Sequence, residues 1–167
     1  MKEIKNYYLN KNTYDKNKIR EWFFVDKNNI RQGSYKSYDI DQNPEIECNY
    51  VNGKLDGLYI EHGNGHIDTK CNYVNGKLNG LCLEYYTNGN LIHEFTYVNG
   101  KIEGIYRVYD PYSKQVKYEY NYINDIRNGW GFRNINVNDS IVKEYVYYEN
   151  DIEVDHPISM KNANKKI

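Results

Sequence analysis

Residues 50–58 read YVNGKLDGL, and this phrase decides the fold because the chain repeats it. Further copies are YVNGKLNGL at residues 73–81, YVNGKIEGI at 97–105 and the weaker YINDIRNGW at 122–130. Successive copies begin 23, 24 and 25 residues apart. Partial copies, FFVDKNNIRQG at 23–33 and YYENDI at 147–152, extend the series. Such a fixed period predicts tandem repeats, here about five over residues 19–155, each a small supersecondary unit.

Each period contains two turns, which makes the repeat a β-hairpin unit. The first turn is the Asn-Gly of the phrase, and the second reads HGNGH at 62–66, YTNGN at 86–90 and YDPYSK at 109–114. Asn-Gly between alternating residues is a strong hairpin signal, because both central positions of a type I′ turn need positive φ. The chain has 25 asparagines and a single alanine, Ala163, which argues against helices. We therefore predict an all-β protein whose tandem hairpins form one elongated, twisted antiparallel sheet.

Alternation assigns the strand residues to two faces. A core face should carry the first residue of each phrase and the residues at even spacing before it. These series are Ile46, Cys48 and Tyr50; Ile67, Thr69, Cys71 and Tyr73; Leu91, His93, Phe95 and Tyr97; and Val116, Tyr118, Tyr120 and Tyr122. If Asn52-Gly53 is the turn, Cys48 faces Gly57, Phe95 faces Gly104 and Tyr120 faces Gly129. The predicted structural positions of the repeat are Tyr50, Gly57, Tyr73, Gly80, Tyr97, Gly104, Tyr122 and Gly129.

The opposite face, called the second face below, mixes apolar and charged residues. A single sheet would leave its apolar side chains uncovered, and exposed apolar patches mark interaction sites. Exposed aromatic residues are also enriched at protein interfaces. We therefore take this face as the candidate partner-binding surface. Its candidate residues are Leu58, Ile60, Leu81, Leu83, Tyr85, Ile105, Tyr109, Trp130 and Phe132.

The phrase resembles the MORN repeat, in the variant Y-x-N-G-K-L-x-G-L-Y-x-E-Y-Y-x-N-G. The resemblance is strong over residues 46–109, weaker over 20–45 and 110–152, and absent from the tail. This variant is found in bacterial proteins, some labelled antitoxin or immunity proteins, and in giant viruses of amoebae. The resemblance implies a scaffold, sometimes at membranes. Asp125 and Ile126 depart from the pattern in the fourth copy, which leaves its turn type and register open.

The two ends lack the phrase. Residues 1–18 are a candidate cap for the first strand, since the end of a repeat array must avoid edge-to-edge association. Residues 156–167 are polar and rich in lysine, and we expect a flexible tail.

Side chains that could carry chemistry are few. His62 and His66 flank one turn, but a metal site needs three or four convergent ligands, so we expect no metal and no cofactor. His93 should be a packed core-face residue. Cys48 and Cys71 should lie about 9–10 Å apart, two strand spacings, and Cys82 diagonal to Cys71, so we expect three reduced thiols. The sequence predicts no catalytic residue and no enzyme.

Charge and hydropathy limit the classes of partner that the protein can have. Residues 34–159 hold 11 basic and 19 acidic groups, a net −8, which argues against nucleic acid. A membrane-surface role would need a basic face, supported only by the +4 of residues 1–33 and by Lys161, Lys165 and Lys166. Without a secretory pattern or a membrane span, we expect a cytoplasmic protein. The sequence favours a non-catalytic protein–protein interaction scaffold; the alternatives are an immunity or antitoxin protein that neutralises a toxin, and a self-assembling or membrane-surface protein.

Overall fold

The computed structural model describes residues 1–10, 13–138 and 140–155, and every regular element in them is a β-strand. Alternating residues favour extended backbone, and the Asn-Gly and Asp-containing turns reverse it at short intervals. The strands are β1 Lys2–Asn10, β2 Thr13–Val25, β3 Arg31–Tyr38, β4 Pro44–Val51, β5 Lys54–Leu55, β6 Gly57–Gly63, β7 His66–Val74, β8 Lys77–Tyr85, β9 Leu91–Val98, β10 Lys101–Ile102, β11 Gly104–Tyr109, β12 Val116–Ile123, β13 Ile126–Arg127, β14 Gly129–Val137, β15 Ser140–Glu149 and β16 Ile152–Glu153.

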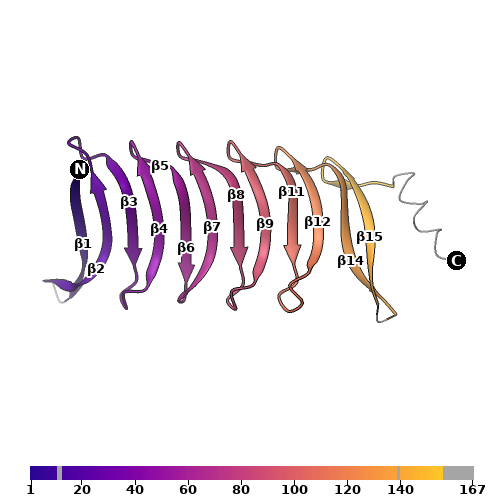
Figure 1. The fold of residues 1–167 in the computed structure, drawn as a ribbon, viewed down its shortest axis with the longest axis horizontal. Helices are drawn as coiled ribbons and strands as arrows, with labels where there is room; N and C mark the ends of the chain where they lie inside the picture. Colours follow the sequence, from indigo (N-terminus) through magenta and orange to yellow (C-terminus); the bar gives the residue numbers. More distant parts are fainter. Residues whose placement is uncertain (11–12, 139, 156–167) are drawn as a thin grey trace.

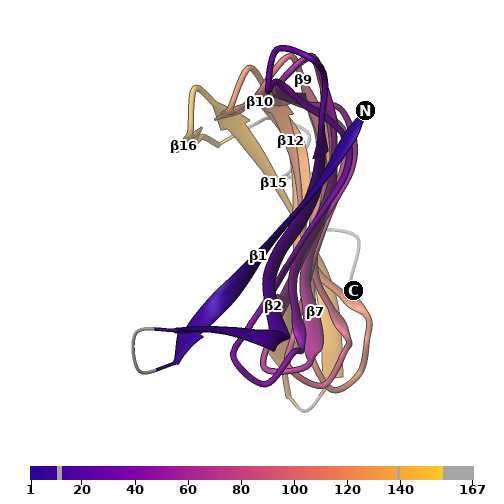
Figure 2. The same cartoon turned by 90° about the vertical axis from the view of Figure 1, so that its left-hand side faces the viewer.

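All sixteen strands belong to one antiparallel sheet whose order follows the chain, from β1 at one edge to β16 at the other. The short strands β5, β10 and β13 lie beside the preceding long strand, so the main path has thirteen members. The hairpins follow one another along the long axis of the molecule (Figure 1). Seen along that axis, the sheet is curved and twisted, and its ends do not meet (Figure 2). The predicted elongated sheet of hairpins is confirmed.

The first turn of each repeat, called the main turn below, has the predicted type I′ geometry. Both central residues have positive φ, with values of 50° and 77° at Asn52 and Gly53 and similar values in the next two copies. The fourth copy keeps this geometry, because Asn124 and Asp125 have φ of 52° and 72°. Asp125 therefore replaces glycine without changing the turn type, since asparagine and aspartate tolerate left-handed backbone better than most residues.

The strand register differs from the predicted one by two residues beyond each main turn. Tyr50 pairs with Leu55 as predicted, but Ile46 pairs with Glu61 and not with Tyr59. The extra residues form a bulge, in which the Asp56 N–H donates to the Asn49 carbonyl at 2.9 Å and Gly57 has φ of +99°.

The predicted partners of the repeated glycines were therefore wrong. Cys48 does not face Gly57, Phe95 does not face Gly104, and Tyr120 does not face Gly129. Each glycine instead lies opposite a tyrosine of the following strand, in the pairs Gly57 with Tyr73, Gly80 with Tyr97, Gly104 with Tyr122 and Gly129 with Tyr148. Because a shift by two is even, the core and second faces keep their identities through the bulge.

Successive turns are joined by hydrogen bonds between repeats. The backbone N–H of Gly76 donates to the Leu55 carbonyl at 2.8 Å, and Gly100 donates to Leu78 at 2.7 Å. The residue before each repeated glycine adds a side-chain acceptor for the next turn, as when Asp56 accepts the Asn75 N–H at 2.9 Å. This explains why the variable position of the phrase is filled by polar residues, namely Gln32, Asp56, Asn79 and Glu103.

The core lies along one face of the sheet. Cys71, Cys82 and Phe95 are its buried centre, with tyrosines and aliphatic residues of the neighbouring hairpins packed around them. Phe95 stacks on Tyr106 with ring centroids 4.8 Å apart and meets Tyr97 edge-on at 5.3 Å. Burial raises the pKa of Tyr106 to about 12. The stack of Phe95 on Tyr106 joins the neighbouring strands β9 and β11, so aromatic residues help to hold the sheet together.

At the N-terminal end, β1 and β2 pair along their length and add a hairpin to the sheet. The boundary expected at residue 18 falls within β2. Strand β1 forms the edge, and its pairing with β2 shifts register on both sides of Tyr7 because β2 carries the extra residues. Such irregular pairing at an edge disfavours edge-to-edge association. The predicted flexible tail, residues 156–167, lies outside the described residues.

Candidate interaction face

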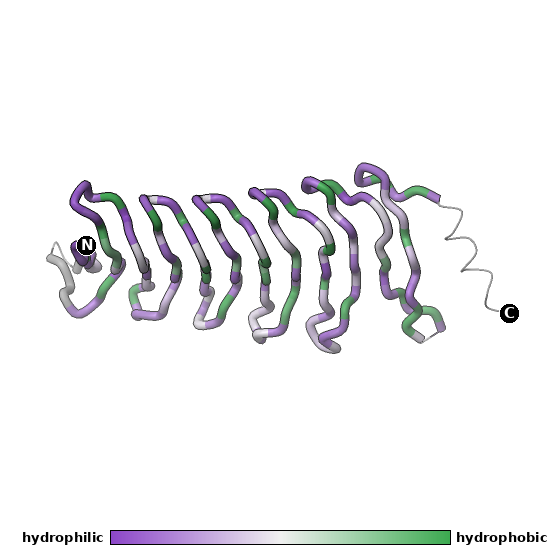
Figure 3. The backbone as a smooth tube through the Cα atoms, turned by 45° about the horizontal axis from the view of Figure 1, so that its top comes forward, coloured by the Kyte–Doolittle hydropathy of each residue, from purple (hydrophilic) through white to green (hydrophobic). Residues whose placement is uncertain are grey.

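Four candidate residues occupy equivalent places on the second face, each directly after a repeated glycine. Leu58, Leu81, Ile105 and Trp130 lie on β6, β8, β11 and β14, with 49%, 44%, 41% and 37% of their surface exposed. Figure 3 shows hydrophobic and hydrophilic residues alternating along the hairpins, as expected for a sheet with two distinct faces. The alternation turns these four side chains away from the core.

Further candidates line a shallow depression in the middle of this face. Leu81, Leu83, Tyr85 and Tyr109 form its walls, and the hollow measures about 510 Å³. The Tyr109 hydroxyl donates to Glu94 at 2.8 Å, and burial raises the pKa of both tyrosines. The depression therefore combines apolar walls with oriented polar groups.

Three residues assigned to the core face belong to the second face. Leu91 pairs with Tyr85 and lines the same depression. Likewise Ile67 pairs with His62, and Val116 with Tyr109. Directly paired residues share a face, so these core-face assignments were wrong. The physical reason is an irregularity in each hairpin next to the second turn, which reverses the alternation of the outermost residues.

Phe132 is only 9% exposed, unlike its candidate neighbours. The Lys143 ammonium lies 3.8 Å from the centre of its ring, and Tyr145 meets the ring edge-on from β15. Ile60, by contrast, is half-buried opposite Glu47. Phe132 is therefore covered by its own hairpin in this structure, and the exposed aromatic residue of β14 is Trp130.

The second face also carries residues that the candidate set missed. The residue after each repeated tyrosine is aliphatic and exposed by 44–52%, and these residues are Val51, Val74, Val98 and Ile123. With the four residues after the glycines they form what we call the apolar stripe: Val51, Leu58, Val74, Leu81, Val98, Ile105, Ile123 and Trp130. Alternation could have found this row, because Val51 directly follows the core-face residue Tyr50.

A row of lysines borders the stripe at the edge formed by the main turns. Lys54, Lys77 and Lys101 pair across the turn with Val51, Val74 and Val98, and therefore share their face. All three are exposed, and none takes part in an ion pair recorded within the described ranges. We call these three residues the lysine row.

Charged groups on the other side of the stripe are paired with one another. Arg107 donates to Glu94 at 3.0 Å and to Glu119 at 2.9 Å. Glu47 accepts from Lys36 at 2.6 Å and contacts His62 at 3.2 Å. Proximity to Lys36 holds the pKa of Glu47 below its ordinary value, although part-burial opposes this effect. The carboxylates along this flank are thus largely neutralised within the sheet.

The cysteines differ from the predicted state. Cys71 and Cys82 lie directly opposite each other, with Cα atoms 4.2 Å apart, and are joined by a disulfide. The expected diagonal placement and reduced thiols were wrong for this pair, because the bulge shifts the register by two and brings Cys82 across from Cys71. Cys48 is free and buried, and burial raises its pKa to about 11.

The histidines have separate acidic neighbours. His66 Nε2 lies 2.8 Å from Asp68, and His93 Nδ1 lies 2.7 Å from Glu84. His93 also contacts the Tyr106 ring on the core face. Within the part of the chain that the structure describes, no three histidine, cysteine, aspartate or glutamate residues gather into a metal-binding group.

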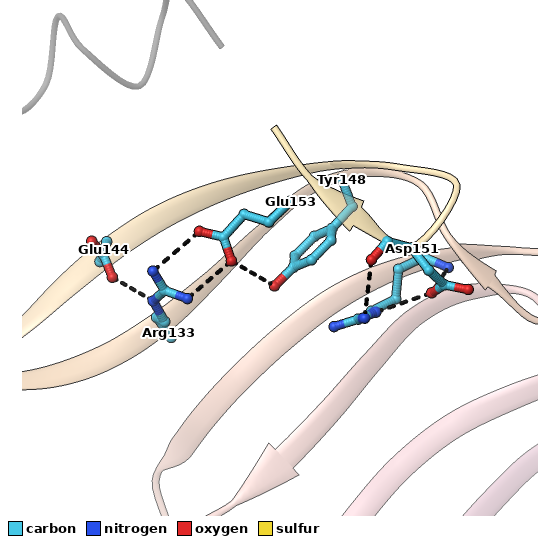
Figure 4. A network of polar contacts seen from close by, with 6 residues as sticks. Arg133, Glu144, Tyr148, Asp151 and Glu153 are labelled. Carbon is cyan, nitrogen blue, oxygen red and sulfur yellow. Dashed lines mark hydrogen bonds and ion pairs between the residues drawn. The ribbon is translucent and has the colours of Figure 1, made fainter. Parts of the chain in front are cut away.

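A polar network closes the C-terminal end on the core face (Figure 4). Arg133 bonds to Glu144 and, through its two terminal nitrogens at 3.1 Å each, to Glu153 of β16. The Tyr148 hydroxyl donates to the same Glu153 at 3.2 Å. These bonds fasten the two-residue strand β16 to its neighbours.

Comparison with known proteins does not identify the chain. No family model matches the sequence, so its resemblance to MORN repeats stays a prediction. No curated protein matches it either. Crystal structures of TarM, one of them of a mutant of the S. aureus protein in complex with Fondaparinux, alpha-GlcNAc-glycerol and UDP, are similar at TM-scores of 0.40 and 0.39. The sequence identities are 11% and 10%, over 57% of this chain and 19% of the TarM chains. Across the described residues, no helix has the length and apolar character needed to cross a membrane.

Proposed function

We propose that this protein is a non-catalytic interaction scaffold that binds another protein through its second face. The observation that carries the proposal is the apolar stripe, to which eight successive strands of the main path contribute one exposed apolar residue each, β4, β6, β7, β8, β9, β11, β12 and β14. Successive stripe residues are diagonal neighbours, because Leu58, Leu81 and Ile105 pair directly with Asn72, Thr96 and Asn121. An array of exposed aliphatic side chains that recurs on every strand is costly to leave in water and is typical of an interaction surface.

The surroundings of the stripe fit the anatomy of a protein interface. Its apolar centre is bordered by charged groups, with the lysine row on one side and the Glu94, Arg107 and Glu119 group on the other. Apolar cores with polar rims are usual at such interfaces. The hydrogen bonds between successive turns support a rigid surface, which lowers the entropy lost on binding.

The same features favour binding over catalysis. The titratable side chains of the second face are spread along an open sheet. Some form ion pairs, as Arg107 does with two glutamates, and others are exposed, as in the lysine row. Enzyme sites instead gather such groups in a concave, water-excluding pocket.

Affinity capture from the native source tests the proposal if parent and variant proteins are compared. Replacing Leu81 and Ile105 together by asparagine should abolish capture of the partner while leaving the circular dichroism spectrum and melting temperature nearly unchanged. Tyr112→Ser is the matched control, since Tyr112 is 89% exposed in a loop. A partner retained equally by the double variant would show that it binds elsewhere.

A further inference from the structure

The apolar stripe has a regular spacing that limits what can cover it. Each of its eight strands supplies one side chain, alternating between the residue after a repeated tyrosine and the residue after a repeated glycine. Neighbouring strands in a sheet lie about 4.7–4.9 Å apart. Measured across the strands, the stripe therefore advances by one apolar side chain per roughly 4.8 Å and runs about 34 Å. Successive side chains are offset alternately by two residues along the strand direction.

An amphipathic α-helix matches this spacing. Apolar residues at alternating intervals of three and four recur on average every 3.5 residues, which at 1.5 Å per residue is about 5.3 Å. The mismatch is about 0.5 Å per strand, or about 3 Å over the whole stripe, less than the width of one side chain. A crossing β-strand would present same-face residues only every 6.6–6.8 Å or so. A polyproline helix has a repeat of about 9.3 Å, but it docks on aromatic walls, whereas seven of the eight stripe residues are aliphatic.

The lysine row indicates that a complementary partner carries negative charge. Lys54, Lys77 and Lys101 recur once per repeat, about 9.6 Å apart, close to the 10.5 Å or so of one heptad. Their ammonium groups border one side of the stripe, and the acidic groups on its other side already have Arg107 and Lys36 as partners. A helix lying on the stripe would be complementary if it carried Asp or Glu once per heptad on the flank that faces the lysines.

We propose that the second face binds a partner's amphipathic α-helix of about 22 residues, laid across the strands with a heptad-spaced apolar seam on the stripe and an acidic flank on the lysine row. The length follows from the 34 Å or so of the stripe at 1.5 Å per residue. This inference rests on the proposed function and adds the class of partner.

Two other occupants fit the face less well. An anionic bilayer would attract the lysine row, but it is flat, whereas the sheet twists along the stripe (Figure 2). A second copy of the chain would place its lysine row either on the like-charged lysine row or on a flank whose carboxylates already have Arg107 and Lys36 as partners.

Synthetic peptides test the inference directly. The probe is a labelled 24-residue peptide with leucine at both seam positions of each heptad and glutamate on one flank. Its controls carry lysine on that flank, or a central proline that breaks the helix. Fluorescence anisotropy at physiological salt should show the tightest binding for the acidic peptide, at least about tenfold weaker binding for the lysine peptide, and loss of binding for the proline peptide.

A charge exchange in the protein makes the test specific. The triple variant Lys54→Glu, Lys77→Glu, Lys101→Glu changes only exposed side chains, so it should fold, and it should now prefer the lysine peptide. The Leu81→Asn, Ile105→Asn variant should lose affinity for both peptides. Equal affinity for the proline peptide, no change of preference in the triple variant, lysine-row-dependent binding to phosphatidylserine vesicles without peptide binding, or self-association through the stripe in sedimentation would each overturn the inference.

The two proposals can fail separately. If capture of the native partner needs Leu81 and Ile105 but no helical peptide binds, the helix inference is wrong and the interaction face stands. If the native partner ignores those residues while the peptides bind as expected, the face is a helix-binding surface that this partner does not use.

Discussion

The regular central repeats and the degraded terminal repeats build the same sheet from different side chains. At the third residue after the asparagine of each main turn, the centre has Leu55, Leu78 and Ile102, whereas the ends have Arg31 and Arg127. Of the central residues, Leu78 and Ile102 pack against the buried core cluster and its rings. Arg127 instead lies over the rings of Tyr120 and Tyr148, at 5.6 and 4.5 Å from their centres.

The turn residue itself shows the same contrast. Asp125 and Asp151 stand where the central repeats have glycine, and both keep positive φ. Their carboxylates accept the backbone N–H of Ile102 at 2.6 Å and of Arg127 at 2.9 Å. The terminal repeats thus replace backbone freedom and apolar packing with hydrogen bonds and cation–π contacts. The central and terminal repeats share one backbone geometry, and different side-chain contacts stabilise it.

The largest expected effect lies in the central core. Phe95 is 4% exposed between rings of two hairpins, so Phe95→Ala should lower the free energy of unfolding by about 3–5 kcal/mol, measured by urea titration. Val146→Ala changes the equivalent, equally buried position of the last hairpin and removes less volume. A greater loss for Val146→Ala would contradict the placement of the main core in the central repeats.

Reduction of the Cys71–Cys82 disulfide should come next. A cross-link over a separation of 11 residues restricts the unfolded chain, and its loss should cost about 2–4 kcal/mol. Thiol titration of the unfolded protein should find one reactive group before reduction, from Cys48, and three afterwards. The Cys71→Ala, Cys82→Ala double variant should show no response to reductant. Three reactive thiols without reductant would refute the bond.

A glycine of a terminal repeat should rank third. Gly131 stands where other repeats have Tyr59 or Tyr106, and an added Cβ would overlap the Glu119 carbonyl oxygen and press on the Tyr120 ring. Gly131→Ala should cost about 2–3 kcal/mol in thermal or urea unfolding. Gly104→Ala has open space but φ of +80°, so it should cost only about 1–2 kcal/mol of backbone strain. The reverse ranking would mean that the aromatic side chains around residue 131 move aside at little energetic cost.

Arg127→Ala should have a smaller effect than Phe95→Ala, loss of the disulfide or Gly131→Ala. Arg127→Ala removes the contacts with two tyrosine rings and with Asp151, for an expected loss of about 1–2 kcal/mol. Arg127→Leu restores the central residue type and should recover part of the loss through apolar packing. If the leucine variant were less stable than the alanine variant, the leucine of the central repeats could not replace the arginine of the terminal repeats at this position.

The smallest effect is expected at the fourth turn. Asp125→Gly loses the bond to the Ile102 N–H but relieves a φ of +72°, so stability should change by no more than about 0.5 kcal/mol. Asp125→Val loses the bond and keeps the strain, and its melting temperature should fall clearly below that of the glycine variant. Equal melting of the two variants would argue against the positive φ.

Much of the architecture could be predicted because it depends on local chemistry. Asn52-Gly53 and its copies specify type I′ turns, and alternation separates Tyr73 from Val74 whatever lies beyond the hairpin. The placement of Leu58, Leu81 and Ile105 on the second face could be predicted for the same reason, since each follows a repeated glycine by one residue. The exposed residues after the repeated tyrosines, Val51, Val74, Val98 and Ile123, and the lysine row were missed although the same alternation contains them.

What the sequence alone determined is the repeat period, the type of turn and the face of most strand residues, because each depends on neighbours a few positions away. The tertiary structure decided the partners across strands. The bulges at Gly57, Gly80, Gly104 and Gly129 shift the register by two, so Cys82 meets Cys71, and irregularities at the second turns move Leu91 to the second face. A bulge preserves the local alternation of side chains but changes which residues pair across strands. Its free-energy cost is offset only by contacts and hydrogen bonds with the next strand, so the tertiary structure decides where it forms.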